Sequence, residues 1–158
     1  MPSARAAVAV AVLGWAMPFT NPARPDIERL LATARTIAVI GLSDNPLRPS
    51  HGVSAAMQRW GYRILPVNPA IAAALGEPAH ATLAEALASL GPGGTIDIVN
   101  VFRRPAHVTR VVDQCLALGL PALWLQDGVV DQASALRARA AGMFVVMDRC
   151  IMRDRAAM

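Results

Sequence analysis

One stretch of the chain has the residue types and the order of a phosphate-binding turn. Residues 37–50 begin as an apolar run, break at Gly41, and continue as a polar, proline-containing loop that leads into a helical pattern. In an α/β fold this order presents the N–H groups and the positive dipole end of a helix to an anion. Arg48 lies in the same loop and adds a full positive charge. The stretch therefore predicts a site for a phosphate group.

Polar or basic residues also follow the other predicted strands. The strand-end sequences are Gly41-Leu42-Ser43, Val67-Asn68-Pro69, Phe102-Arg103-Arg104 and Gln126-Asp127-Gly128. If the strands are parallel, these ends meet at one edge of the sheet, which is where ligands bind in open α/β folds. Arginine side chains bind phosphates through paired hydrogen bonds. The edge therefore suits a ligand with several phosphates.

Motifs that the chain lacks narrow the choice of nucleotide. No G-x-G-x-x-G turn follows residues 37–40, because the next glycine after Gly41 is Gly52. Asn68 stands where a dinucleotide site has an acidic residue for the ribose. A P-loop is excluded because the chain contains no lysine. Ordinary NAD binding is disfavoured, while an NADP- or sugar-nucleotide-dependent enzyme stays open, since the arginines could meet a 2′-phosphate.

Composition indicates a folded domain of ordinary size. The chain has 158 residues, of which 54% are hydrophobic and 16% charged, and this balance excludes disorder. The net charge is +4 and all 15 basic residues are arginine, which reflects either composition bias or anion binding. The arginines are scattered and only 4% of residues are aromatic, so a nucleic-acid surface is disfavoured.

Alternating helix and strand patterns predict an α/β fold. Helical stripes begin at residue 26 and after Gly41, Thr82, Pro105 and Asp131. Strands are expected at residues 36–40, 63–67, 96–102, 122–125 and 143–147. Strands joined by crossover helices form a doubly wound parallel sheet, here of about five to six strands with helices on both faces. Residues 17–158 are expected to form one domain.

The first residues have a different character. Ala6 to Met17 is almost entirely apolar, which is too short to span a membrane but long enough for the core of a signal peptide. The alternative is that translation starts at Met17 and residues 1–16 are an extension of the gene model. We favour the internal start, because the rest of the chain has a nucleotide-type pattern and two cysteines without disulfide-framework spacing.

Six motifs, in order, resemble a known family. They are residues 37–43, 48–50, 61–69, 97–104, 123–130 and 146–150. Together they are similar to small stand-alone CoA-binding proteins, whose Rossmann-like domain is similar to the N-terminal CoA-binding domain of the succinyl-CoA synthetase alpha subunit. The resemblance covers roughly Met17 to Met152, and it implies a single Rossmann-like domain that binds coenzyme A or an acyl-CoA.

The resemblance also assigns roles to the residues that follow the first two predicted strands. Gly41, Leu42 and Ser43 match the turn around the CoA pyrophosphate, and Arg48 matches a cation near the nucleotide phosphates. Residues 67–69 (Val67, Asn68 and Pro69) match the wall beside the adenine.

The other strand ends match the route of the pantetheine arm. Phe102 and Arg103 would border it, and Gln126 and Gly128 would lie where it leaves the sheet. The synthetase domain that carries the phosphorylated histidine is absent here, so ligase chemistry is not implied. We expect a cytoplasmic protein with a small-molecule CoA ligand and no contact with nucleic acid or membrane. Its expected partner is a second copy of itself, as a homo-oligomer, or an acyl-transfer partner protein.

Cys150 is the residue with the clearest reactive potential. It follows Asp148 and Arg149, and a neighbouring arginine lowers the pKa of a thiol. A thiol or redox carrier using Cys150 is therefore an alternative function. We expect Cys150 to lie against the core and react slowly with alkylating reagents, because residues 143–147 are an apolar run. No catalytic residue and no metal site is predicted from the three separated histidines.

The interpretation of residues 1–16 is testable by truncation. We expect a chain that begins at Met17 to fold and to bind CoA as well as the full chain, because the first helical stripe starts after that point. The measurement is soluble yield, thermal unfolding and CoA affinity of both chains. Loss of soluble expression on truncation, or recovery of a periplasmic protein that lacks residues 1–16, would contradict the internal start.

Overall fold

Five parallel strands form the centre of the fold, in the order β2-β1-β5-β6-β7. The computed structural model describes residues 18–158, so the expectations for residues 1–16 lie outside the described residues. The strands are β1 (Thr36–Ile40), β2 (Arg63–Val67), β5 (Ile98–Val101), β6 (Ala122–Leu125) and β7 (Phe144–Met147). Every pairing in this sheet is parallel. The doubly wound sheet predicted from the sequence is confirmed.

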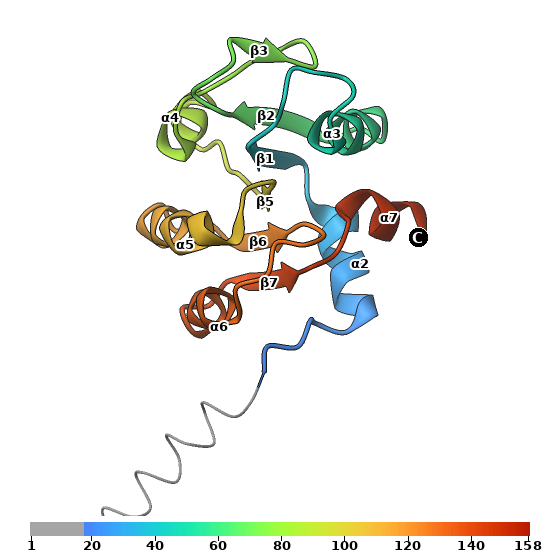
Figure 1. Ribbon diagram of the computed structural model, residues 1–158, viewed down its shortest axis with the longest axis vertical. Coiled ribbons are helices and arrows are strands. Elements are labelled where there is room, and N and C mark those ends of the chain that lie inside the picture. The colour runs from blue at the N-terminus through green and yellow to red at the C-terminus, as the bar shows by residue number, and fades with distance from the viewer. Residues whose placement is uncertain (1–17) are drawn as a thin grey trace, which may run out of the picture.

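Helices cover both faces of the sheet (Figure 1). One face carries α2 (Arg24–Thr33), α3 (Pro49–Arg59) and α7 (Ile151–Ala156). The other carries α4 (Leu83–Ala88), α5 (Val108–Ala117) and α6 (Gln132–Ala140). Each layer has its own hydrophobic cluster, so the strands are buried on both sides and are apolar at nearly every position.

Two elements are absent from the sequence-based prediction. A short antiparallel hairpin, β3 (Ala73–Ala74) and β4 (Glu77–Pro78), lies between β2 and α4. The other is α7, which follows β7 after a turn at Asp148 with φ of +59°. Both are too short to produce a periodic pattern, and α7 begins without a side-chain cap. Among residues 18–158, none of the helices combines the length and the apolar composition that crossing a lipid bilayer requires.

The strand order reverses between β1 and β5. From β1 the chain crosses to β2 on one side, and from β5 it crosses to β6 on the other. The backbone N–H of Gly41 donates to the carbonyl of Val67 (2.9 Å), and that of Phe102 donates to Ile40 (2.9 Å). Gly41 has φ of +85°, and a Cβ on it would stand 2.3 Å from the carbonyl oxygen of Phe102. Such a switch point is where ligands bind in this class of fold.

The close approach at Gly41 predicts a large effect on stability. Gly41→Ala should lower the free energy of unfolding by about 2–5 kcal/mol, because a left-handed conformation costs an alanine about 1–2 kcal/mol and overpacking adds a similar amount. The control is Gly119→Ala, where φ is +65° and no atom lies within 4 Å of the added Cβ. Urea unfolding of both variants separates the cost of the backbone conformation from the cost of the contact with Phe102. Equal losses of unfolding free energy in the two variants would show that this contact adds nothing.

Candidate functional site

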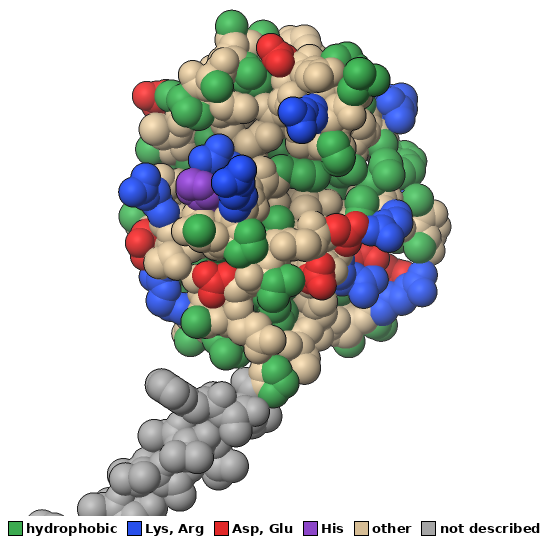
Figure 2. Space-filling view, viewed as in Figure 1, with side chains coloured by type: hydrophobic (Ala, Val, Ile, Leu, Met, Phe, Trp, Pro, Cys, Tyr) green, Lys and Arg blue, Asp and Glu red, His purple; other side chains and the backbone are tan. Residues whose placement is uncertain are grey.

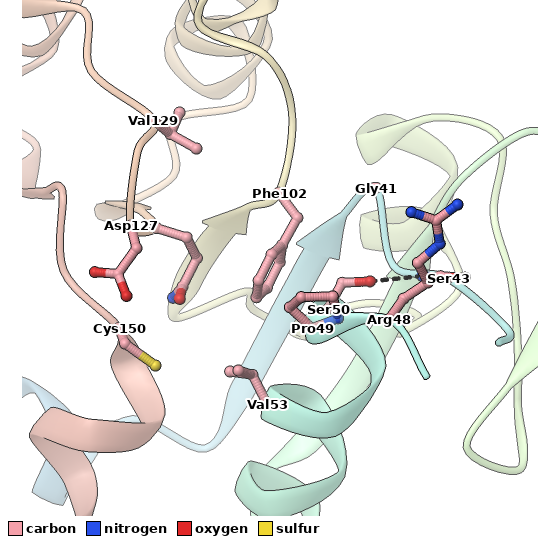
Figure 3. A pocket seen from close by; sticks show the side chains of 11 residues that line it. Gly41, Ser43, Arg48, Pro49, Ser50, Val53, Phe102, Asp127, Val129 and Cys150 are labelled. Atoms are coloured by element: carbon pink, nitrogen blue, oxygen red, sulfur yellow. Dashed lines mark hydrogen bonds between the residues drawn. The ribbon is translucent and has the colours of Figure 1, made fainter. Parts of the chain in front are cut away.

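A cavity of about 630 Å³ lies at the carboxyl ends of β1, β5 and β6. Its walls are completed by the start of α3 and by the turn before α7 (Figure 3). The lining residues are Gly41, Ser43, Arg48, Pro49, Ser50, Val53, Phe102, Gln126, Asp127, Val129 and Cys150. The structure thus brings together residues from segments that are more than a hundred positions apart in the chain.

The loop between β1 and α3 is held by its own side chains. The Ser50 hydroxyl accepts a hydrogen bond from the backbone N–H of Ser43 (3.0 Å), and the Ser43 hydroxyl accepts one from Asn45 (3.1 Å). The Asn45 carboxamide oxygen in turn accepts from Leu47 (3.0 Å). These local bonds fix the turn that leads from Gly41 into α3. The polar side chains of the loop are therefore used to hold its backbone.

The N-terminal end of α3 is suited to an anion. Arg48 is its N-cap residue and provides no side-chain cap, Pro49 occupies the first turn, and that turn contains no acidic residue. The positive end of the dipole is thus not neutralised by the helix itself. Arg48 is exposed, and in the part of the chain that the structure describes it forms no ion pair. This donor set fits a phosphate or pyrophosphate group.

The opposite wall comes from the segments after β6 and β7. In Figure 3, Arg48 and Ser43 lie on one side of the Phe102 ring, and Asp127 and Cys150 lie on the other. Gln126 is only 3% exposed, and its amide Nε2 donates to the Oδ1 of Asn100 (2.7 Å). This buried pair explains how Asn100 is accommodated in the middle of β5.

Several residues that the sequence places in the site lie outside this cavity. Leu42 is fully buried in the core beneath the loop, and Val67 is buried at the end of β2. The Nδ2 of Asn68 donates to the carbonyl of Leu42 (3.0 Å), so Asn68 ties β2 to the loop. Pro69 is exposed beyond it. Gly128 donates its N–H to Asp148 (2.8 Å), which joins the two turns behind the opposite wall.

Arg103 does not line the cavity but lies beside it. Its Cδ is 3.0 Å from the position that a Cβ on Gly41 would occupy. Its side chain therefore lies against Gly41, and both Arg103 and Arg104 are exposed.

Six lining residues are not among the predicted site residues: Pro49, Ser50, Val53, Asp127, Val129 and Cys150. Pro49, Ser50, Val129 and Cys150 belong to motifs that carry the family resemblance, and for Pro49 and Ser50 a helix start directly after a phosphate-type turn is a further signal. Val53 is buried on the core face of α3 and also lines the cavity. The positions of Asp127, Val129 and Cys150 in the opposite wall depend on how the turns after β6 and β7 fold, and hydrophobic periodicity does not predict those turns.

Both cysteines are free and buried, but they differ in surroundings. Cys115 is fully buried within α5, and burial raises its pKa to about 12. Cys150 is 8% exposed, as its expected position against the core requires, and its sulfur points into the cavity (Figure 3). Arg149 is held by Asp154 through two hydrogen bonds of 2.8 and 2.6 Å, which raises the pKa of the arginine. Its charge is therefore already engaged by a carboxylate.

These surroundings predict an order of thiol reactivity. In the folded protein a small alkylating reagent should modify Cys150 slowly, through the cavity, and should leave Cys115 unmodified even at pH 9–10, where an ordinary thiol ionises. In urea both should react at similar rates. Peptide mass spectrometry after timed quenching measures the two sites, and modification of Cys115 ahead of Cys150 would contradict the assignment.

Comparison with known proteins places the chain in a family. A family model described as "CoA binding domain" matches residues 35–156. The Bacillus subtilis (strain 168) protein YneT is 44% identical over 131 residues, which are 83% of this chain and 93% of YneT. The solved Thermus thermophilus protein cell-free ID.343 has a TM-score of 0.77 at 34% identity and covers 86% of this chain and 98% of its own.

A larger enzyme contains a similar fold. The dinucleotide-forming acetyl-coenzyme A synthetase 1 of Ca. Korarchaeum cryptofilum has a TM-score of 0.59 at 19% identity, over 77% of this chain and 27% of the synthetase. At this identity the likeness shows the fold alone. The family model and YneT, by contrast, cover most of the present sequence. The chain therefore belongs to the family of CoA binding domains.

Proposed function

We propose that the protein binds coenzyme A or an acyl-CoA in this cavity, with the CoA pyrophosphate at the start of α3. Membership in a CoA-binding family supports CoA binding in general. The observation that carries the placement is the uncapped, basic N-terminal end of α3, which opens onto the cavity beside Gly41. An anion at that position meets the helix dipole, the charge of Arg48 and the backbone N–H of Ser50. Pro49 has no N–H, and the N–H groups of His51 and Gly52 already donate to the carbonyl of Arg48.

The side chains that line the cavity support a path for the rest of the CoA molecule. Val53, Phe102 and Val129 give the cavity an apolar section beyond the phosphate end. The pantetheine arm would lie along it, toward Gln126 and Asp127. The adenine would lie on the other side of Gly41, beside residues 67–69 at the end of β2. Asn68 supports this wall because its side chain fixes both Leu42 and Ala70.

The proposed role is binding, with no catalytic group assigned. The histidines stand apart from the cavity lining, and we assign them no role. Two free cysteines are typical of a reducing compartment, which supports a place in the cytoplasm. A CoA-loaded form would deliver its ligand to, or receive it from, a separate acyl-transfer partner.

A second candidate function is thiol exchange at Cys150. It is favoured by one observation, the sulfur that points into the same cavity. In that reaction the Cys150 thiolate would attack CoA disulfide, form a protein–CoA mixed disulfide and release one CoA thiolate. Incubation with CoA disulfide and intact-mass measurement tests it. An adduct of CoA mass that is absent from Cys150→Ser would establish this function, and no adduct would leave simple binding.

Selective stabilisation tests the main proposal. CoA should raise the melting temperature in a concentration-dependent way, and NAD should not, because the chain lacks the acidic ribose contact of a dinucleotide site. Acetyl-CoA, NADP and ATP are measured in parallel. Equal stabilisation by CoA and NAD would count against the proposal.

The role of Arg48 can be isolated with a matched variant. Arg48→Ala should weaken CoA binding by about 1–3 kcal/mol, the range of a charge-assisted hydrogen bond, and should leave unfolding unchanged because the side chain is exposed. Arg63→Ala is the control, since Arg63 is also exposed but begins β2 at the far edge of the sheet. Calorimetric titration measures both. Unchanged affinity in Arg48→Ala would remove this residue from the site.

A further inference from the structure

Three exposed basic side chains follow β5 at a spacing of three residues. Arg104 directly precedes the 3₁₀ turn η1 (Pro105–His107), His107 ends it, and Arg110 lies in the first turn of α5. Residues three apart are neighbours on a helical turn, so these side chains form one row. All three are exposed, and Figure 2 shows basic side chains and a histidine together on the face where α5 begins. We refer to Arg104, His107 and Arg110 as the β5–α5 basic row.

The arginines of the row have no acidic partners. Within residues 18–158 neither Arg104 nor Arg110 forms an ion pair. Asp113, on the next turn of α5, is paired with Arg137 (2.7 Å). Neither η1 nor the first turn of α5 contains an acidic residue. Positive side chains on successive turns repel one another, and an acidic partner that lies over them removes this repulsion.

The row faces outward. None of its residues lines the cavity at the carboxyl ends of the strands, whereas small molecules bind in concave sites. The apolar side chains of the same segment, such as Val108 and Val111, are buried on the opposite side of the turn. The row is therefore open to the surface of another macromolecule.

Arg103 connects the row to the cavity. Its Cδ lies 3.0 Å from the place that a Cβ on Gly41 would occupy, and Gly41 lines the cavity. Arg104 and η1 follow directly in the chain. A macromolecule that lies on the row is therefore placed beside the cavity.

The residue types favour an acidic protein surface over nucleic acid. Residues 103–110 contain no aromatic side chain on which a base could stack. The row is also short, whereas a nucleic-acid surface has a longer basic stripe that contacts many phosphates. Arginine side chains pair with Asp and Glu carboxylates through two parallel hydrogen bonds. The row thus matches a short run of acidic side chains.

We infer that the β5–α5 basic row docks an acidic segment of a partner protein, a run of Asp and Glu side chains, beside the cavity. The docking surface itself stands on exposure and charge. Its purpose, transfer of CoA or an acyl-CoA between the two proteins, rests on the proposed function. Exposed ion pairs are individually weak and are screened by salt, so docking is transient and is lost at high ionic strength. Complementary charge of this kind speeds association and sets its orientation.

A fluorescent glutamate decamer is the probe, and anisotropy measures its binding to the full chain at about 0.02 M salt. The double variant Arg104→Ala/Arg110→Ala should bind the decamer at least about fivefold more weakly than the unchanged protein. The control, Arg35→Ala/Arg63→Ala, removes two exposed arginines at the amino ends of β1 and β2, which also lack ion pairs among residues 18–158. It should bind the decamer within about twofold of the unchanged protein. Salt at about 0.5 M should release the decamer, and a glutamine decamer should not bind.

Each contrary result has a distinct meaning. Absence of decamer binding at low salt, or equal losses in the two double variants, would overturn the inference, because net charge alone would then explain any binding. An oligonucleotide of equal charge that binds more tightly than the decamer, and loses affinity in Arg104→Ala/Arg110→Ala, would assign the row to nucleic acid and overturn it as well.

Calorimetric titration with CoA separates docking from the cavity. Arg104→Ala/Arg110→Ala should keep the CoA affinity of the unchanged protein, and a loss of CoA affinity would place the row in the ligand site and overturn the inference. Absence of CoA binding by the unchanged protein would overturn the proposed function, while the decamer result would still decide the docking surface. Unliganded melting temperatures confirm that the variants are folded.

Discussion

The site depends on the close passage of two chain segments at the switch point between β1 and β5. Gly41 turns with φ of +85° beneath the carbonyl of Phe102, where a Cβ would stand 2.3 Å from the oxygen. Because no side chain intervenes, β1 can lead into the loop before α3 while β5 leads away toward α5. The two segments diverge from one point, and the cavity opens between them. Glycine is required here by contact as well as by backbone conformation.

Around Gly41, some side chains hold the backbone of the loop and others carry positive charge. Ser43, Ser50 and Asn45 use their side chains on backbone N–H groups of the loop. The arginines at the same edge, Arg48 and Arg103, have no carboxylate partner in residues 18–158. When a rigid turn carries charges without partners, anion binding has no free-energy cost for ordering the loop or for breaking an ion pair.

The strand and helix pattern was readable in the sequence because most elements are long enough to show a period. β1 and β2 have the predicted bounds, and the start of α6 follows Asp131, whose carboxylate accepts from Ser134 as a cap. β5 is shorter than predicted and begins at Ile98. Asp97 directly before it donates its N–H to the carbonyl of Thr36, and its carboxylate accepts from the backbone N–H groups of Arg35 and Thr36. The turn into α7 is fixed by contacts made across the fold, such as Trp124 to the carbonyl of Arg149, and no local pattern reports those.

The same distinction separates the two walls of the cavity. Gly41, Ser43 and Phe102 stand within three residues of a strand end, so the parallel sheet brings them together. Arg48 is placed by the side-chain hydrogen bonds of the loop that leads into α3. Cys150 lines the cavity after a turn at Asp148 that has φ of +59° and whose carboxylate accepts a hydrogen bond from the N–H of Gly128. The net charge of +4 likewise does not indicate where an anion binds. The fold decides which individual arginines are paired with carboxylates. Near the cavity, Arg149 and Arg153 are paired with Asp154 and Asp127. Within residues 18–158, Arg48 and Arg103 have no such carboxylate partner and keep their full charge for a ligand.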